Sequence, residues 1–276
     1  MKTITHPDDF IEWRKLARGL LFEEVPPHDI LWQEKDQASL FQENSTSPMK
    51  GTIPNVSKAF IELANTVSSH RSDEQWALLY SILWRLTHGE KYLLNLVTDP
   101  EVHRVKAMVK HISRDIHKMH AFVRFRKVGK ENEREQFVAW FEPDHRIVRL
   151  TSSFFRKRFA GMDWSILTPD ECMHWDGTKI HFTEGVSKSQ APDADAQEEL
   201  WKTYYRNIFN PARLKVNAMQ SEMPKKYWKN LPEAEIIEEL ISTSSETTQE
   251  MLEKPSSPEK PAPKNTYLEK LKTLDS

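Results

Sequence analysis

The sequence predicts an α+β protein with a helical N-terminal part, an antiparallel sheet of about five strands, C-terminal helices and a disordered tail. Three observations lead to this prediction. Apolar residues recur at intervals of three and four through most of the first 120 residues, which is typical of helices. Apolar and polar residues alternate in the middle of the chain, as in half-buried strands. After residue 242 the chain is mostly polar, so no core can form there.

We therefore divide the chain into one α+β domain, residues 1–241, and a disordered polar tail, residues 242–276. The domain has three consecutive parts. Residues 8–98 form a helical part, residues 99–183 a helix plus the antiparallel sheet, and residues 195–241 the C-terminal helices.

Three helices are expected in the helical part. Asp8, Asn55 and Ser72 each precede an apolar run of helical spacing, and all three are residue types that cap helices. Ser72 with Gln75 also matches a capping box. The apolar positions of the runs are Phe10, Trp13, Leu16 and Leu20; Val56, Phe60, Leu63 and Val67; and Trp76, Leu79, Leu83 and Leu86. Residues 31–41 fit either a strand or a short helix.

The helix expected over residues 100–119 has two distinct faces. One face is apolar and comprises Val102, Val105, Val109, Ile112, Ile116 and Met119. Another face is basic and comprises His103, Lys106, Lys110, Arg114 and His117. His120 falls at or beyond the helix end. The helix should therefore bury one side in a core and present positive charge on the other.

The sheet begins directly after this helix. Residues 121–128 alternate as a strand, with Arg124 and Arg126 on one face, and residues 136–143 return as an antiparallel partner. A short helix is expected next, within residues 151–162, and then a strand that ends at Pro169. Asp176-Gly177, between two alternating segments, predicts a two-residue hairpin turn.

The C-terminal part is again helical. Residues 185–197 are a linker, and residues 198–209 predict a helix. Asn210-Pro211 is a good start for the next helix, because proline is favoured at the first helical position. A further short helix is expected after Pro232.

Charge is distributed unevenly along a chain whose formal net charge is −2. Residues 101–160 hold 15 Lys and Arg against 7 Asp and Glu, a net charge of +8. Residues 231–276 hold 5 Lys against 10 acidic residues, a net charge of −5. A basic segment of this kind indicates a surface that binds a polyanion, although an ordinary solvated face has the same composition.

Few residues suit metal or redox chemistry. The single cysteine, Cys172, excludes a disulfide within the chain and a cysteine-based zinc site. His117 and His120 are three residues apart, but no motif supplies the further ligands that a metal needs. They fit a surface and helix-end pair, or a phosphate contact made by His117. We expect no metal and no cofactor.

The N-terminus lacks the apolar segment of a signal peptide, and no window is long and apolar enough to cross a bilayer. These two features predict a cytoplasmic protein without membrane contact.

A catalytic role is weakly supported by sequence motifs. The phosphate-binding and nucleophile motifs GxxxxGK[ST], GxGxxG and GxSxG do not occur. Asp144 beside His145 fits an acid–base pair, or equally a turn in which the carboxylate bonds backbone N–H groups. No catalytic residue is assigned. A candidate pocket would comprise His120, Asp144, His145, Trp175, Tyr204 and Tyr205.

Basic and aromatic residues occur together in two further segments, "FFRKRF" at 154–159 and "MPKKYWKN" at 223–230. Lys and Arg neutralise phosphates, while aromatic rings stack on bases. Trp228 is a candidate stacking platform. The expected nucleic-acid contacts are Lys110, Arg114, His117, Arg124, Arg126, Arg156, Lys157, Arg158, Lys225, Lys226 and Trp228.

Five segments, in order, carry a resemblance to a known family. They are "DIHKMHAFVRFR" (115–126), "AWFEPDH" (139–145), "FFRKRFAGMDWSILTPDECMHWDG" (154–177), "LWKTYYRNIFNPARLKVNAM" (200–219) and "MPKKYWKNLPEA" (223–234). Over about residues 100–240 the chain resembles an uncharacterised bacterial family described as probable DNA metabolism or putative DNA repair proteins. The resemblance implies a partner, a radical-SAM protein similar to spore photoproduct lyase. A closely similar domain also lies ahead of uracil-DNA glycosylase-like domains of the uracil-crosslinking type.

The start of the chain, "FIEWRKLARGLLFEEVPPHDILW" (10–32), resembles that fused form, but the end departs from it. After "NLPEA" only a polar tail follows, and the acidic motif and His-Pro-Ser loop of a glycosylase do not occur. Glycosidic cleavage by this chain alone is therefore not expected.

Three functions remain open from the sequence. The first is a nucleic-acid-binding accessory protein of DNA repair, acting with a radical-SAM or uracil-DNA glycosylase-like partner. The second is an enzyme that acts on DNA or a nucleotide through the candidate pocket. The third is a protein-partner module without nucleic-acid contact.

Overall fold

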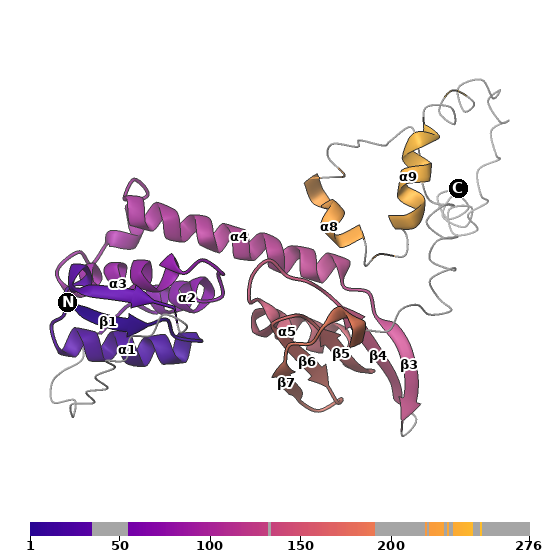
Figure 1. The fold of residues 1–276 in the computed structure, drawn as a ribbon, viewed down its shortest axis with the longest axis horizontal. Helices are drawn as coiled ribbons and strands as arrows, with labels where there is room; N and C mark the ends of the chain where they lie inside the picture. Colours follow the sequence, from indigo (N-terminus) through magenta and orange to yellow (C-terminus); the bar gives the residue numbers. More distant parts are fainter. Residues whose placement is uncertain are drawn as a thin grey trace, which may run out of the picture.

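The structure is a computed structural model that describes residues 1–34, 55–131, 134–190, 219, 221–228, 231, 234–244 and 249. Figure 1 shows a long helix, α4 (Pro100–Phe122), that runs from an N-terminal group of helices to a five-stranded sheet. The expected α+β class is confirmed. No helix among these residues combines the length and the apolar character needed to cross a bilayer.

The N-terminal part adds a small sheet to the expected helices. The helices are α1 (Phe10–Phe22), α2 (Lys58–Val67) and α3 (Glu74–Thr87), with short 3-10 turns η1 (Pro27–Asp29) and η3 (Leu93–Asn95). Strand β1 (Lys2–Thr5) pairs in parallel with β2 (Ile30–Gln33), and α1 is the crossover that a parallel pair requires. The described part of residues 31–41 is thus strand rather than helix. Helices and strands share one apolar core.

The caps of these helices differ slightly from expectation. Asp9 caps α1 and Ser57 caps α2, one and two residues beyond the expected positions. The Ser72–Gln75 capping box does not form, because the Gln75 amide is buried and donates to the carbonyl of Ser68 instead. A tertiary hydrogen bond has here replaced a local one.

Helix α4 connects two cores. The Asp99 carboxylate caps it by accepting the N–H groups of Glu101 and Val102, each at 3.0 Å. The expected apolar stripe is confirmed. Its N-terminal half packs in the core of the helical part, and its C-terminal half, from Ile112 to Met119, packs in the core of the sheet. Because the apolar side of α4 is buried in the two cores, the opposite side faces away from them.

The sheet is mixed and mostly antiparallel. Its order is β3 (Arg126–Glu131), β4 (Arg134–Trp140), β5 (Asp163–Leu167), β6 (Glu171–Trp175) and β7 (Ile180–Glu184). Only the β4–β5 pair is parallel, because helix α5 (Val148–Arg158) carries the chain back between these two strands. The loop before α5 therefore lies at the C-terminal end of β4.

Two local details of the sheet differ from the sequence prediction. Strand β3 begins at Arg126, not at residue 121, because α4 continues to Phe122. The turn between β6 and β7 has four residues, 176–179, rather than two. Gly177 still occupies the left-handed conformation, with φ of +87°, that favours glycine.

The C-terminal segment docks on α4 and the sheet core. Helices α8 (Lys225–Trp228) and α9 (Ala234–Ser242) belong to it, and the 3-10 turn η4 (Lys188–Gln190) precedes it. Tyr227 is 1% exposed, and its ring stacks on Phe141 and Phe122 at centroid distances of 5.2 and 5.5 Å. The helix expected over 198–209, the Asn210-Pro211 start and most of the tail lie outside the described residues.

Candidate nucleic-acid interface and histidine cluster

The solvent side of α4 carries a row of basic residues, which we call the basic stripe. It consists of His103, Lys106, Lys110, Arg114 and His117. All five are exposed, and none of their side chains makes a hydrogen bond or ion pair with another described residue. Their 3-4-4-3 spacing places them opposite the buried stripe. Three expected nucleic-acid contacts, Lys110, Arg114 and His117, therefore lie together on an open surface.

A second basic group lies at the end of α5. Arg156, Lys157 and Arg158 are exposed in its last turn. Cations in a last turn also interact favourably with the helix dipole, so their position has a structural explanation as well. On the same helix, Phe154 is 37% exposed and stacks on His120 of α4, with ring centroids 3.7 Å apart.

The remaining expected contacts are engaged within the protein. Arg124 donates to the carbonyls of Ala121 and Val123, at 2.7 and 3.3 Å, and so closes the end of α4. It precedes β3, so it does not share a strand face with Arg126, and both are half-buried. Contact of either arginine with nucleic acid stays a prediction.

The α8 residues are held beside α4. Lys226 forms an ion pair with Asp144, and its ammonium lies 4.6 Å from the centroid of the Tyr227 ring. Lys225 lies over Trp228, whose indole N–H donates to the Met223 carbonyl at 3.0 Å. Trp228 as a stacking platform stays a prediction.

The described members of the candidate pocket do not meet. His145 precedes the N-terminus of α5, His120 stacks on Phe154 within α5, and Trp175 donates to the carbonyl of Ala160 beyond its C-terminus. Because α5 spans about 15 Å at 1.5 Å per residue, these side chains do not line one pocket. Asp144 adjoins His145, and Tyr204 and Tyr205 lie outside the described residues.

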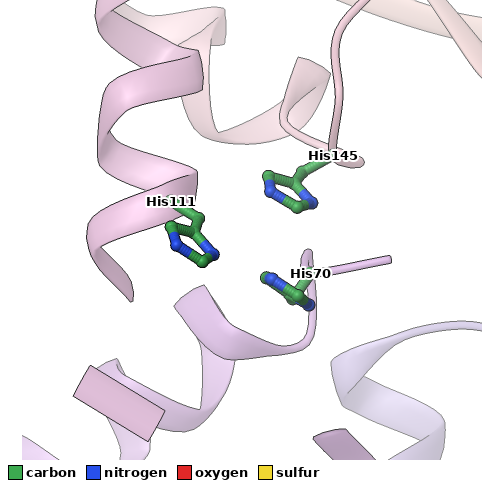
Figure 2. A group of neighbouring side chains, drawn as sticks. All are labelled: His70, His111 and His145. Atoms are coloured by element: carbon green, nitrogen blue, oxygen red, sulfur yellow. The ribbon is translucent and has the colours of Figure 1, made fainter. Parts of the chain in front are cut away.

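His145 instead belongs to a cluster of three histidines from three separate elements. Figure 2 shows the rings of His70, His111 and His145 facing one another. One ring nitrogen of each lies within 4.8 Å of those of the other two. The His70 and His145 rings stack with centroids 4.3 Å apart. Within the described ranges, this is the one group of histidine, cysteine or carboxylate side chains close enough to share a metal ion.

Each histidine is placed by its own element. His70 follows α2 in a turn and donates its backbone N–H to the Val67 carbonyl at 2.9 Å. His111 is an exposed residue of α4. His145 lies in the loop between β4 and α5, where its backbone N–H donates to the buried carboxylate of Asp115 at 2.8 Å.

Backbone N–H groups fix two of the three rings. The N–H of Ser72 donates to Nδ1 of His70 at 3.1 Å, and the N–H of Arg71 donates to Nδ1 of His145 at 3.4 Å. Nε2 of His70 is buried and has no hydrogen-bond partner. The guanidinium of Arg71 holds the same turn against the sheet, because it binds both carboxylate oxygens of Asp170.

Burial shifts the pKa values of the titratable groups in and beside the cluster. Burial, with the neighbouring His70 ring, lowers the pKa of His145 to about 4. Burial and the nearby His111 also lower the pKa of His70. Burial raises the pKa of Asp115, although the N–H of His145 opposes that shift. At neutral pH the His70 and His145 rings are therefore uncharged.

Sequence reasoning missed this cluster because its members are far apart along the chain. His70 and His111 match no motif, and only His145 drew attention, through its neighbour Asp144. The sequence contains no signal that would have paired them, since the contacts depend on how the turn after α2 meets α4. The expected absence of a metal stays a prediction.

Comparison with known proteins identifies the family. Residues 73–233, more than half of the chain, match the family model DUF4130, a domain of unknown function. The chain belongs to the DUF4130 family. No curated protein and no solved structure matches it. The DUF4130 region contains the basic stripe, the sheet, α8 and two of the three clustered histidines, while His70 lies three residues before it.

Proposed function

We propose that this DUF4130 protein binds nucleic acid through the basic stripe of α4, as an accessory protein of DNA repair. The stripe carries the proposal, because five exposed basic residues lie on one helix face without an acidic partner among the described residues. From His103 to His117 it extends about 21 Å at 1.5 Å per residue. That length matches the rise of about six nucleotides of one strand.

A lysine or arginine side chain that forms no ion pair can turn toward a ligand at little cost in free energy. A basic side chain that is held in an ion pair, in contrast, must break that pair before it can contact a phosphate. By contrast, Arg104 on the same helix pairs with Glu74 and is not part of the stripe. Arg156, Lys157 and Arg158 of α5 would extend the contact beyond α4.

The role in DNA repair is supported by the resemblance of five ordered segments to the family described as DNA metabolism proteins. This resemblance and the basic surface support the same function, since proteins of DNA metabolism act on nucleic acid. A uracil-DNA glycosylase-like or radical-SAM partner would then supply the chemistry for which this chain has no motif.

Fluorescence anisotropy with labelled single- and double-stranded DNA tests the proposal. The variant is Lys106→Gln with Lys110→Gln and Arg114→Gln. The matched control also removes three exposed positive charges, as Lys15→Gln with Lys58→Gln and Lys91→Gln. Binding should weaken in the stripe variant and stay unchanged in the control. Equal loss in both would show only a general effect of net charge, and no DNA binding by the wild type would refute the proposal.

A protein contact is favoured by a separate observation. Tyr92, Leu96 and Val97, just before α4, are 78%, 51% and 63% exposed. Neighbouring exposed apolar side chains often mark a protein interface. We propose that this segment contacts the repair partner. Calorimetry with a purified uracil-DNA glycosylase-like protein should show weaker binding for Tyr92→Ser with Leu96→Ser, and unchanged affinity would refute the contact.

A further inference from the structure

The histidine cluster raises a choice between two kinds of ligand. A metal needs nitrogen lone pairs that point at it, whereas an oxyanion needs N–H groups. A neutral imidazole has one nitrogen of each kind, and the hydrogen bond at one nitrogen decides the role of the other. The backbone contacts of the rings therefore decide the choice.

Those contacts favour N–H donors. Nδ1 of His70 accepts the N–H of Ser72, and Nδ1 of His145 accepts the N–H of Arg71. Each Nδ1 must therefore carry a lone pair, and the proton of each neutral ring resides on Nε2. Metal-bound histidines show the reverse arrangement, because their second nitrogen donates its proton to a carbonyl or carboxylate.

From this tautomer argument we infer that His70, His111 and His145 form a donor site for a phosphate oxyanion, and not a metal site. Nε2 of His70 is a buried N–H group with no acceptor, and leaving such a group unpaired is costly. His111 completes the group from α4; it is exposed, and its ring has no hydrogen-bond partner among the described residues.

The surroundings suit an anion. His111 lies one turn before Arg114, so the cluster adjoins the basic stripe. Burial, with the nearby charges of Arg114 and Lys226, lowers the pKa of Lys118, two turns after His111, while Asp144 and Glu222 oppose that shift. The carboxylates near the cluster already have partners. Glu74, whose charge raises the pKa of His70 against the effect of burial, pairs with Arg104. Asp144 pairs with Lys226, and Asp115 accepts the N–H of His145 and the hydroxyl of Tyr227.

The source of the phosphate rests on the proposed function: a backbone phosphate of the nucleic acid would enter the cluster from the basic stripe. The oxyanion chemistry itself does not depend on DNA binding, and free phosphate has the same acceptor atoms. The two sources are therefore tested in separate arms.

Nitrogen-15 NMR of the full chain tests the donor site directly. Long-range proton–nitrogen spectra, assigned with single His→Asn variants, should show the proton on Nε2 of His70 and His145. Inorganic phosphate and a short oligothymidylate should each shift these Nε2 signals saturably. Protons on Nδ1, or equimolar Zn²⁺ or Co²⁺ binding that His145→Asn abolishes, would overturn the inference. Shifts with phosphate but none with DNA would support the site and overturn its nucleic-acid source.

Salt dependence separates this site from the basic stripe. A neutral N–H donor releases no counterion, so His111→Asn with His145→Asn should weaken oligonucleotide binding about tenfold without changing the salt slope. A slope reduced by about 0.7 for each histidine would mean a cationic contact and would overturn the inference. If the double variant misfolds, His111→Asn alone tests the same contact, because His111 is exposed and its substitution should leave the fold intact. The control is His28→Asn, at an exposed position of η1.

Discussion

Replacing Tyr227 by alanine should detach α8 from α4 and lower the stability of the whole protein. Tyr227 is 1% exposed and packs between the rings of Phe122 and Phe141. Its hydroxyl donates to the buried Asp115 carboxylate at 3.3 Å. The same side chain thus connects the C-terminal segment to the helix that carries the basic stripe.

The size of the effect follows from these contacts. Truncation of a fully buried aromatic ring to alanine costs about 3–5 kcal/mol, and two stacked pairs place Tyr227 toward the upper part of that range. Tyr227→Phe keeps both stacked pairs and loses only the hydroxyl bond to a carboxylate, which costs about 1.5–3 kcal/mol. With a urea dependence of about 2.5 kcal/mol per molar, a loss of 4 kcal/mol lowers the midpoint by roughly 1.5 M.

Urea denaturation followed by tryptophan fluorescence measures both variants. The matched control is Tyr92→Ala, because Tyr92 is 78% exposed and its loss should leave the midpoint unchanged. A Tyr227→Ala midpoint within about 0.3 M of the wild type, less than 1 kcal/mol, would show that α8 is not docked as described.

Three further predictions concern other parts of the fold. Burial lowers the pKa of His120, beside His117, and of His174, beside His181, so as the pH falls these two residues are protonated in the unfolded chain before they are protonated in the folded protein. Stability to urea should therefore fall as the pH drops below about 6.5, and it should fall less steeply in His120→Gln. An equal slope in that variant would exclude His120 as a cause. Gly185→Ala should lower the free energy of unfolding by about 1–3 kcal/mol, because a Cβ there would collide with the backbone of Pro169. Unchanged thermal stability would contradict this packing. The control is Gly161→Ala, where a Cβ meets no atom within 4 Å. Cys172 is 0% exposed in β6, so a thiol reagent should modify it only after unfolding, and stoichiometric labelling of the native protein would contradict its burial.

Much of the fold was predictable because local patterns match tertiary burial. The apolar stripe of α4 has the spacing of a buried helix face, and the structure buries it. The alternation of β6 and β7 likewise predicted strands, and they form. In these elements, propensity and burial favour the same conformation, so the sequence alone was informative.

Other elements depend on contacts between distant segments. Strand β1 exists through its pairing with β2, and four residues give no periodic signal. The parallel β4–β5 pair is set by how α5 packs, which no local pattern reveals. For the same reason, the meeting of His70, His111 and His145 could not be predicted, whereas the basic stripe, which lies within one helix, could be.

The salt dependence of DNA affinity for the wild type and the stripe variant Lys106→Gln, Lys110→Gln, Arg114→Gln tests the central claim most directly. Each lost phosphate contact removes about 0.9 from the slope of log affinity against log salt for duplex DNA, and about 0.7 for single strands. The variant should therefore bind with a slope shallower by about 2–3, and with affinity lower by up to about 500-fold at 0.1 M salt. Equal slopes for the two proteins would mean that the stripe does not touch the phosphates, and the account of α4 as a nucleic-acid interface would be contradicted.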